Sequence, residues 1–140
     1  MAFDAPLFAV LDSDQLARLT ARSSLSTVDT GQIVAHRGTP ATKLIVVETG
    51  ALTAIRETAD GQRLRLGEFP APCAIDKAAV LDAGGHTATW IAAVRSQLRL
   101  IPAVELFAII DDVPAVRQHV LRVLAGQVRD HQDDLAQASF

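Results

Sequence analysis

Short apolar runs separated by glycine-marked turns occupy the middle of the chain, and this pattern limits the fold more than any other feature. Three such runs, at 33–34, 44–47 and 52–55, each fit one strand bounded by turn residues. Asp60-Gly61 predicts a hairpin after them, because glycine accepts the positive φ that tight turns require. Strands at this spacing leave no room for crossover helices, so we expect an antiparallel sandwich or barrel.

Helical patterns flank this β region on both sides. Asp12 and Gln15 have the spacing of a capping box ahead of a short amphipathic segment. Residues 104–110 form a short apolar helix, and Pro114 suits the first turn of a longer helix that continues to about residue 136. The expected single domain, 1–140, divides into a helical lead, a β-roll and C-terminal helices at 1–27, 28–101 and 103–140.

The last helix carries two apolar stripes. One consists of Val116, Val120 and Val123. The other, which we call the seam, follows a heptad spacing and consists of Leu121, Leu124, Val128, His131 and Leu135. A helix with two apolar stripes needs two partners, so we expect the β-domain to cover one and a second copy of the chain to cover the other in a two-fold dimer. Protonation of the seam histidine near neutral pH would affect such a dimer.

Composition excludes several classes of protein. Thirteen Lys and Arg against 16 Asp and Glu give a net charge of −3, and the basic residues are scattered, so we expect no direct nucleic-acid contact from this chain. The single cysteine, Cys73, rules out an internal disulfide and an iron–sulfur cluster with several Cys ligands. No apolar run approaches the roughly 18 residues of a membrane span and no basic leader is present, so we expect no membrane partner and a cytoplasmic location.

Several segments in order resemble a known family. They are PLFAVL at 6–11, GQIVAHRG at 31–38, LIVVETG at 44–50 and RLIP at 99–102. Together they resemble the cyclic-nucleotide-binding domain family, which includes the sensor domains of catabolite-activator-type transcription factors. The resemblance covers about residues 5–135. It implies a mainly β fold with flanking helices: an antiparallel β-roll, of the double-stranded β-helix or jelly-roll kind, followed by a long C-terminal helix.

The residues that hold the cyclic phosphate in this family are replaced here. The family pattern is Gly-Glu at a helix start and, about ten residues on, Arg followed by a small residue. Counting back from Trp90 puts Asp76 at the glycine, Lys77 at the glutamate, Thr87 at the arginine and Ala88 at the small residue. No arginine lies between positions 65 and 95, so the guanidinium that would bind phosphate bidentately is absent. The expected pocket is degenerate, with candidates Asp76, Lys77, Ala78, His86, Thr87 and Ala88.

Two charged residues of this segment have competing interpretations. Lys77 is either a point charge for an anion or a solvated lysine beside Asp76. Asp76 with Asp82 is either an acid–base pair or, as an aspartate at a helix start usually is, a cap. No nucleophile or oriented histidine stands near either aspartate in the sequence, so we favour the cap and expect no enzyme activity.

The histidines, the cysteine and the tryptophan also have two interpretations each. The histidines (His36, His86, His119 and His131) lack any metal-ligand spacing, so we favour surface or interface roles and expect no metal and no cofactor, haem included. Cys73 among small apolar residues fits inert packing better than an oxidant sensor. Trp90 fits the core better than a purine-stacking role.

These observations favour a non-catalytic regulatory domain that binds a non-standard small, nucleotide-like ligand or none, and that signals through a dimerising C-terminal helix. One alternative is a genuine sensor of cyclic AMP or cyclic GMP that uses Lys77 and backbone N–H groups. The other is a purely structural dimerisation module.

Overall fold

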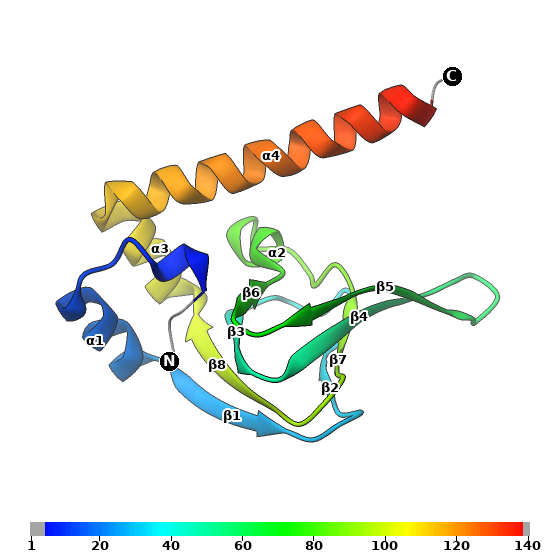
Figure 1. Ribbon diagram of the computed structural model, residues 1–140, viewed down its shortest axis with the longest axis horizontal. Helices are drawn as coiled ribbons and strands as arrows, with labels where there is room; N and C mark the ends of the chain where they lie inside the picture. Colours follow the sequence, from blue (N-terminus) through cyan, green and yellow to red (C-terminus); the bar gives the residue numbers. More distant parts are fainter. Residues whose placement is uncertain (1–4, 139–140) are drawn as a thin grey trace.

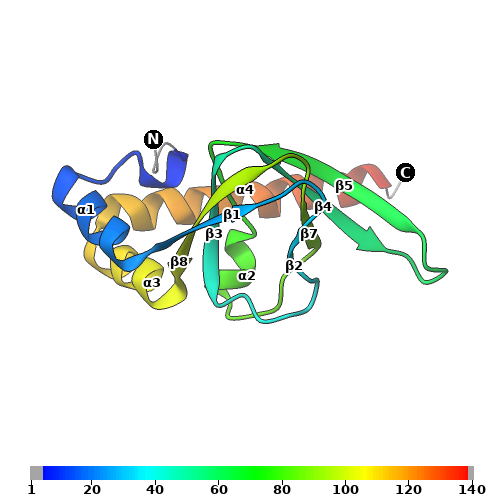
Figure 2. The same cartoon turned by 90° about the horizontal axis from the view of Figure 1, so that it is seen from below.

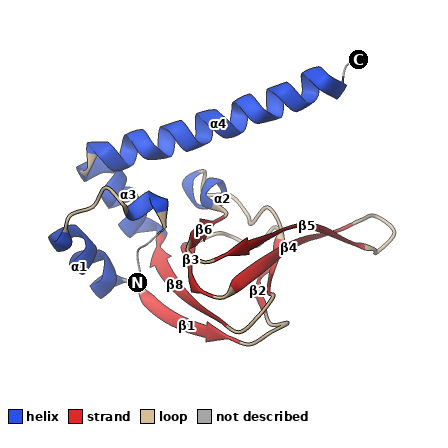
Figure 3. Cartoon of the chain, viewed as in Figure 1, coloured by secondary structure: helices blue, strands red, loops and turns tan. Residues whose placement is uncertain are grey.

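Two four-stranded sheets and a set of helices on one side make up the molecule (Figures 1 and 3). The computed structural model describes residues 5–138, and it describes side chains as far as Asp130. The helices are η1 (Pro6–Phe8), α1 (Ser13–Arg22), α2 (Lys77–Leu81), α3 (Ala103–Asp112) and α4 (Pro114–Ala138). The strands are β1 (Ser24–Val28), β2 (Ile33–Ala35), β3 (Lys43–Thr49), β4 (Ala51–Glu57), β5 (Arg63–Pro70), β6 (Cys73–Ile75), β7 (Thr89–Ala92) and β8 (Ser96–Pro102).

The two sheets have strand orders β1-β8-β3-β6 and β2-β7-β4-β5, and every pairing is antiparallel. Consecutive strands change sheet several times, so the chain rolls up around the space between them (Figure 2). This arrangement confirms the β-roll with flanking helices. The predicted hairpin is β4–β5, with Gly61 at φ +82° in the turn.

Strand β3 connects two hydrophobic cores. Because successive strand residues point to opposite faces, Leu44 and Val46 pack against the helices while Ile45 and Val47 pack between the sheets. Val46 and Val47 are both fully buried. The sheet that contains β3 is therefore a layer shared by both cores.

The sequence missed one strand at the start of the roll. The roll was expected from residue 28, whereas β1 begins at Ser24 and pairs along β8. Most of its side chains are exposed, and Leu25 is 52% exposed. A strand that buries so little contains no apolar run, which explains why the pattern did not reveal it.

The helices pack as a group against the β1-β8-β3-β6 sheet. Asp12 and Gln15 form the expected capping box at the start of α1. On α4, Val116 and Val120 are buried against the domain, as expected of the first stripe. No helix within residues 5–138 has both the length and the apolar character that crossing a membrane requires.

The seam residues of α4 are not all alike. Leu121 and Val128 are 59% and 58% exposed, whereas Leu124 is partly buried against the core of its own domain. The side chains of His131 and Leu135 lie outside the described residues. In Figure 1, α4 runs above the β-roll with only its first turns close to the other helices, and Leu121 and Val128 on it are exposed to solvent.

Candidate functional site

The candidate pocket is built by β6, α2 and the loop that leads into β7. Asp76 links β6 to α2 in the left-handed conformation, with φ +53°. Aspartate tolerates this region better than most residues with a Cβ. This backbone turns its side chain away from the helix, so Asp76 makes no side-chain capping bond to α2. The interpretation of Asp76 as a helix cap is therefore wrong.

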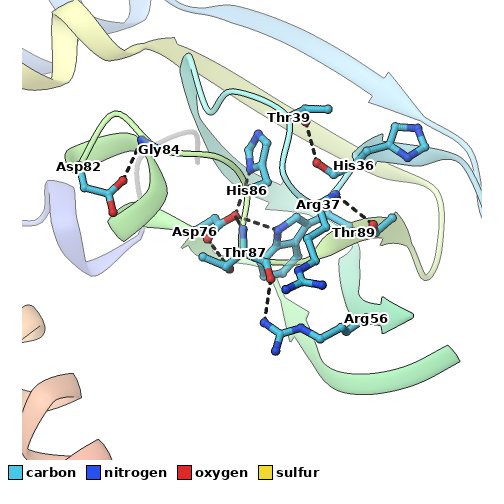
Figure 4. Close-up of polar contacts among 11 residues, drawn as sticks. His36, Arg37, Thr39, Arg56, Asp76, Asp82, Gly84, His86, Thr87 and Thr89 are labelled. Atoms are coloured by element: carbon cyan, nitrogen blue, oxygen red, sulfur yellow. Dashed lines mark hydrogen bonds and ion pairs between the residues drawn. The ribbon is translucent and has the colours of Figure 1, made fainter. Parts of the chain in front are cut away.

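The Asp76 carboxylate reaches the 86–90 segment instead (Figure 4). Its Oδ2 atom accepts hydrogen bonds from Thr87 N at 3.0 Å and Trp90 Nε1 at 3.2 Å, and it lies 3.0 Å from His86 Nδ1. Its Oδ1 atom accepts from the Thr87 hydroxyl at 2.7 Å. With a side chain only 3% exposed, Asp76 is a buried anion surrounded by donors.

The donors decide the charge of this carboxylate. Burial by itself raises the pKa of Asp76, but the hydrogen bonds from Thr87, His86 and Trp90 favour the ionised form more strongly, so the pKa lies below its ordinary value. An ionised carboxylate is only an acceptor, so His86 Nδ1 must carry the hydrogen in this contact. The expected surface or interface role of the histidines is wrong for His86, which is buried at this site.

Three of the candidate residues thus meet: Asp76, His86 and Thr87. Lys77 does not join them. Its Nζ donates to the Ala74 carbonyl at 3.1 Å, and it lines a small cavity between α2 and α4. Lys77 is partly buried, which lowers its pKa, so the interpretation as a solvated lysine is also wrong. Ala78 lies on α2, and Ala88 is buried in the core between the sheets.

The other residues that the sequence analysis singled out, Trp90, Cys73 and Asp82, lie outside the candidate pocket or in its walls. Trp90 is 4% exposed, and its ring makes an edge-to-face contact with Phe69 at a centroid distance of 5.1 Å, in agreement with a core role. Burial raises the pKa of the Cys73 thiol, which agrees with inert packing. Asp82 is exposed, and its Oδ1 accepts from Gly84 N. No three potential metal ligands gather anywhere in the described part of the chain.

A cavity of about 860 Å³ lies next to the Asp76 cluster. Its lining includes His36, Arg37, Arg56, Glu57, His86 and Thr87. The sequence reasoning missed both arginines, because it examined only the segment that carries the family's phosphate-binding pattern. Arg37 comes from the turn between β2 and β3 and Arg56 from β4. No local spacing connects these positions to residue 87.

Comparisons with known proteins agree with the fold. Residues 25–112 match the model of the cyclic nucleotide-binding domain family. The catabolite activator protein of Thermus thermophilus has a TM-score of 0.86 at 21% identity, covering 97% of this chain and 64% of that chain. The N-terminal domain of a transcriptional regulator from Streptomyces coelicolor A3(2) is 30% identical, with a TM-score of 0.75 and coverage of 94% and 92%. The sensor domain of the regulator DNR from Pseudomonas aeruginosa is 26% identical, with a TM-score of 0.83 and coverage of 91% and 85%.

An antiparallel roll with a short helix and loop at one edge, continued by a long helix, defines a class of regulatory domains, and the Streptomyces coelicolor and Pseudomonas aeruginosa structures come from transcriptional regulators. The chain belongs to the cyclic nucleotide-binding domain family, because the family model matches more than half of it. It spans 64% of the Thermus thermophilus protein. No curated protein matches its sequence.

Proposed function

We propose that this chain is a non-catalytic regulatory domain whose own Asp76 carboxylate replaces the ligand phosphate of its family, and that it communicates its state through a dimerising α4. The observation that carries this proposal is the set of donors around Asp76. A bound phosphate requires N–H and O–H donors around an anion. Here Thr87, His86 and Trp90 already direct theirs to a carboxylate supplied by the chain.

Two effects oppose a cyclic nucleotide at this position. The phosphate would have to displace a carboxylate that is tethered in place, and it would carry the same sign of charge. Thr87 also stands where the family places a guanidinium, so the strongest attractive contact is missing. The ligand is then non-standard or absent.

The rival function, true cyclic-nucleotide binding through Lys77, receives no support from the geometry. The Lys77 ammonium donates to the Ala74 carbonyl and lies on the side of α2 that faces α4. The purely structural rival shares one observation with our proposal, which is the exposure of Leu121 and Val128 on α4. The pyrophosphate titrations described below distinguish a regulatory domain that binds a ligand from a purely structural module.

Titration calorimetry with cyclic AMP and cyclic GMP tests the degenerate pocket. Each hydrogen bond to a charged group contributes about 1.5–3 kcal/mol, so losing the arginine–phosphate and carboxylate–ribose contacts costs about 3–6 kcal/mol. At about 1.4 kcal/mol per tenfold, affinity falls by roughly two to four orders of magnitude relative to an intact pocket. We expect no measurable binding by the natural sequence, and tight binding would refute the proposal.

A pair of variants isolates the role of Asp76. The double variant Lys77→Glu with Thr87→Arg restores the family's charged contacts but keeps the internal carboxylate. The triple variant adds Asp76→Gly, which vacates that place. We expect measurable cyclic-nucleotide binding only from the triple variant. Equal binding by both variants would show that Asp76 does not occupy the phosphate position.

A further inference from the structure

The cavity beside the 85–89 segment brings together two arginines that are distant in the sequence. Arg37 and Arg56 both line it, and in Figure 4 both side chains extend toward Thr87. Thr87 forms the wall between this cavity and the Asp76 cluster. Its N–H and hydroxyl bind Asp76, whereas its carbonyl accepts from Arg56 Nη2 at 3.2 Å. The cavity is therefore separate from the place that Asp76 fills.

We propose that this cavity binds a small phosphate-bearing molecule through Arg37 and Arg56. The inference rests on the proposed regulatory function, since it supplies the ligand that such a domain would sense. A volume of about 860 Å³ suits a small organic ligand. Two guanidiniums present planar forks of donors that match phosphate oxygens.

The charges in the cavity favour an anion. The Arg37 guanidinium makes no hydrogen bond or ion pair within the described residues, and Arg56 uses one donor on Thr87. Each guanidinium has five N–H donors, so most remain available. His86 Nδ1 already contacts the Asp76 carboxylate at 3.0 Å, so this atom is not available to a ligand. Glu57 is the one carboxylate in the lining and opposes an anion, but two arginines outweigh it.

The backbone around Arg37 is held in place before any ligand arrives. Gly38 N donates to the His86 carbonyl and His86 N to the Thr39 carbonyl, both at 2.9 Å, while Arg37 N donates to the Thr89 hydroxyl at 3.0 Å. A Cβ added to Gly85 would lie 2.7 Å from the Gly38 carbonyl oxygen, so only glycine permits this approach. The backbone that carries Arg37 is therefore fixed in advance, and only its side chain has to be ordered when a ligand binds.

Inorganic pyrophosphate is the probe for this site. We expect calorimetry on the full chain to show binding with a dissociation constant of about 1 mM or tighter. Arg37→Gln and Arg56→Gln should each weaken it by about tenfold to a hundredfold, the range for a lost charge-assisted contact. Arg95→Gln is the matched control, because the Arg95 side chain is 76% exposed outside the cavity; it should change binding less than about twofold.

A variant that binds pyrophosphate more tightly cannot be explained by unfolding, so it complements the two arginine variants. Glu57→Gln removes the opposing carboxylate, so we expect pyrophosphate to bind more tightly. Amide chemical shifts of residues 37–39 and 85–89 should move on titration of the natural sequence. Absence of binding by the natural sequence, or equal weakening by Arg95→Gln and Arg37→Gln, would overturn the proposal.

The same titrations separate this inference from the proposed function. If pyrophosphate does not bind and cyclic nucleotides do not either, the arginine site is wrong and the degenerate pocket stands. If cyclic AMP binds tightly and displaces pyrophosphate, both the proposed function and the separate arginine site are wrong. If pyrophosphate binds and cyclic AMP at about 1 mM leaves that binding unchanged, both are supported.

Discussion

Asp76 is the residue on which the proposed function rests. Its carboxylate accepts from Thr87, His86 and Trp90 in a place that is almost fully buried. Buried donors are costly to leave without an acceptor, so this residue stabilises the loop, and in our proposal it also occupies the anion position. Its effect on ligand binding and its effect on stability have the same physical origin.

Asp76→Asn removes the charge at nearly constant shape. An amide can accept through one atom only, so its NH₂ group would face one or more of the donors. We expect the free energy of unfolding at about pH 7 to fall by about 2–4 kcal/mol, measured by urea unfolding. Asp82→Asn is the control, because Asp82 is exposed, and it should cost less than about 0.5 kcal/mol. Similar losses in both variants would contradict the role given to Asp76.

The same variant should alter the response to acid. Because folding lowers the pKa of Asp76 below 3.8, its stabilisation is complete above that value and is lost as the pH falls below it toward the folded-state pKa. The natural sequence should therefore lose more stability over this range than Asp76→Asn does. Asp60, whose pKa its hydrogen bond from Thr58 also lowers, is common to both proteins and cancels in the comparison. Parallel stability curves would contradict this prediction.

Among the elements, α4 has two different apolar faces. Val116 and Val120 pack on the domain, while Leu121 and Val128 are more than half exposed. Exposed apolar residues one heptad apart on a long helix fit a second helix of the same kind. Leu124 lies between the two faces and already packs against its own domain, so it is a poor site for testing association.

Leu121→Asp and Val128→Asp should each shift the protein from dimer to monomer in light scattering. Each side chain contributes about 1.5–3 kcal/mol when fully buried, and a carboxylate at that place would have to be desolvated. Ala115→Asp is the control, because Ala115 is exposed on α4 about 120° around the helix axis from Leu121. A natural sequence that is monomeric at high concentration would exclude the dimer.

At the scale of the whole molecule, the two cores share the β1-β8-β3-β6 sheet. Strand β3 directs Val46 to the helices and Val47 to the space between the sheets. Neither core can lose its packing without disturbing the strand that supports the other. The roll and the helices should therefore unfold as one unit.

Unfolding followed by two probes tests this coupling. Trp90, the only tryptophan, reports on the core between the sheets, while far-UV circular dichroism is dominated by the helices. We expect both signals to change at the same urea concentration. Val46→Ala and Val47→Ala should each lower the free energy of unfolding by about 2–3 kcal/mol and shift both signals together. Separate midpoints in either variant would show that the cores unfold independently.

Local sequence patterns alone determined much of this protein. The glycine-marked runs predicted the roll, Asp12 and Gln15 predicted the start of α1, and the two apolar stripes predicted that α4 buries one face. These features depend on residues within a few positions of one another, so period and spacing reveal them. The replacement of the family's phosphate-binding residues could also be recognised from the sequence, because those residues lie within one short segment.

Only the tertiary structure decided what replaces that pattern. Asp76 resembles a helix cap in sequence, yet its left-handed backbone directs the carboxylate to donors ten to fourteen residues away. Arg37 and Arg56 share a cavity because strands from different parts of the chain pair around it. Contacts between distant residues depend on how the sheets close, and no spacing along the chain encodes them.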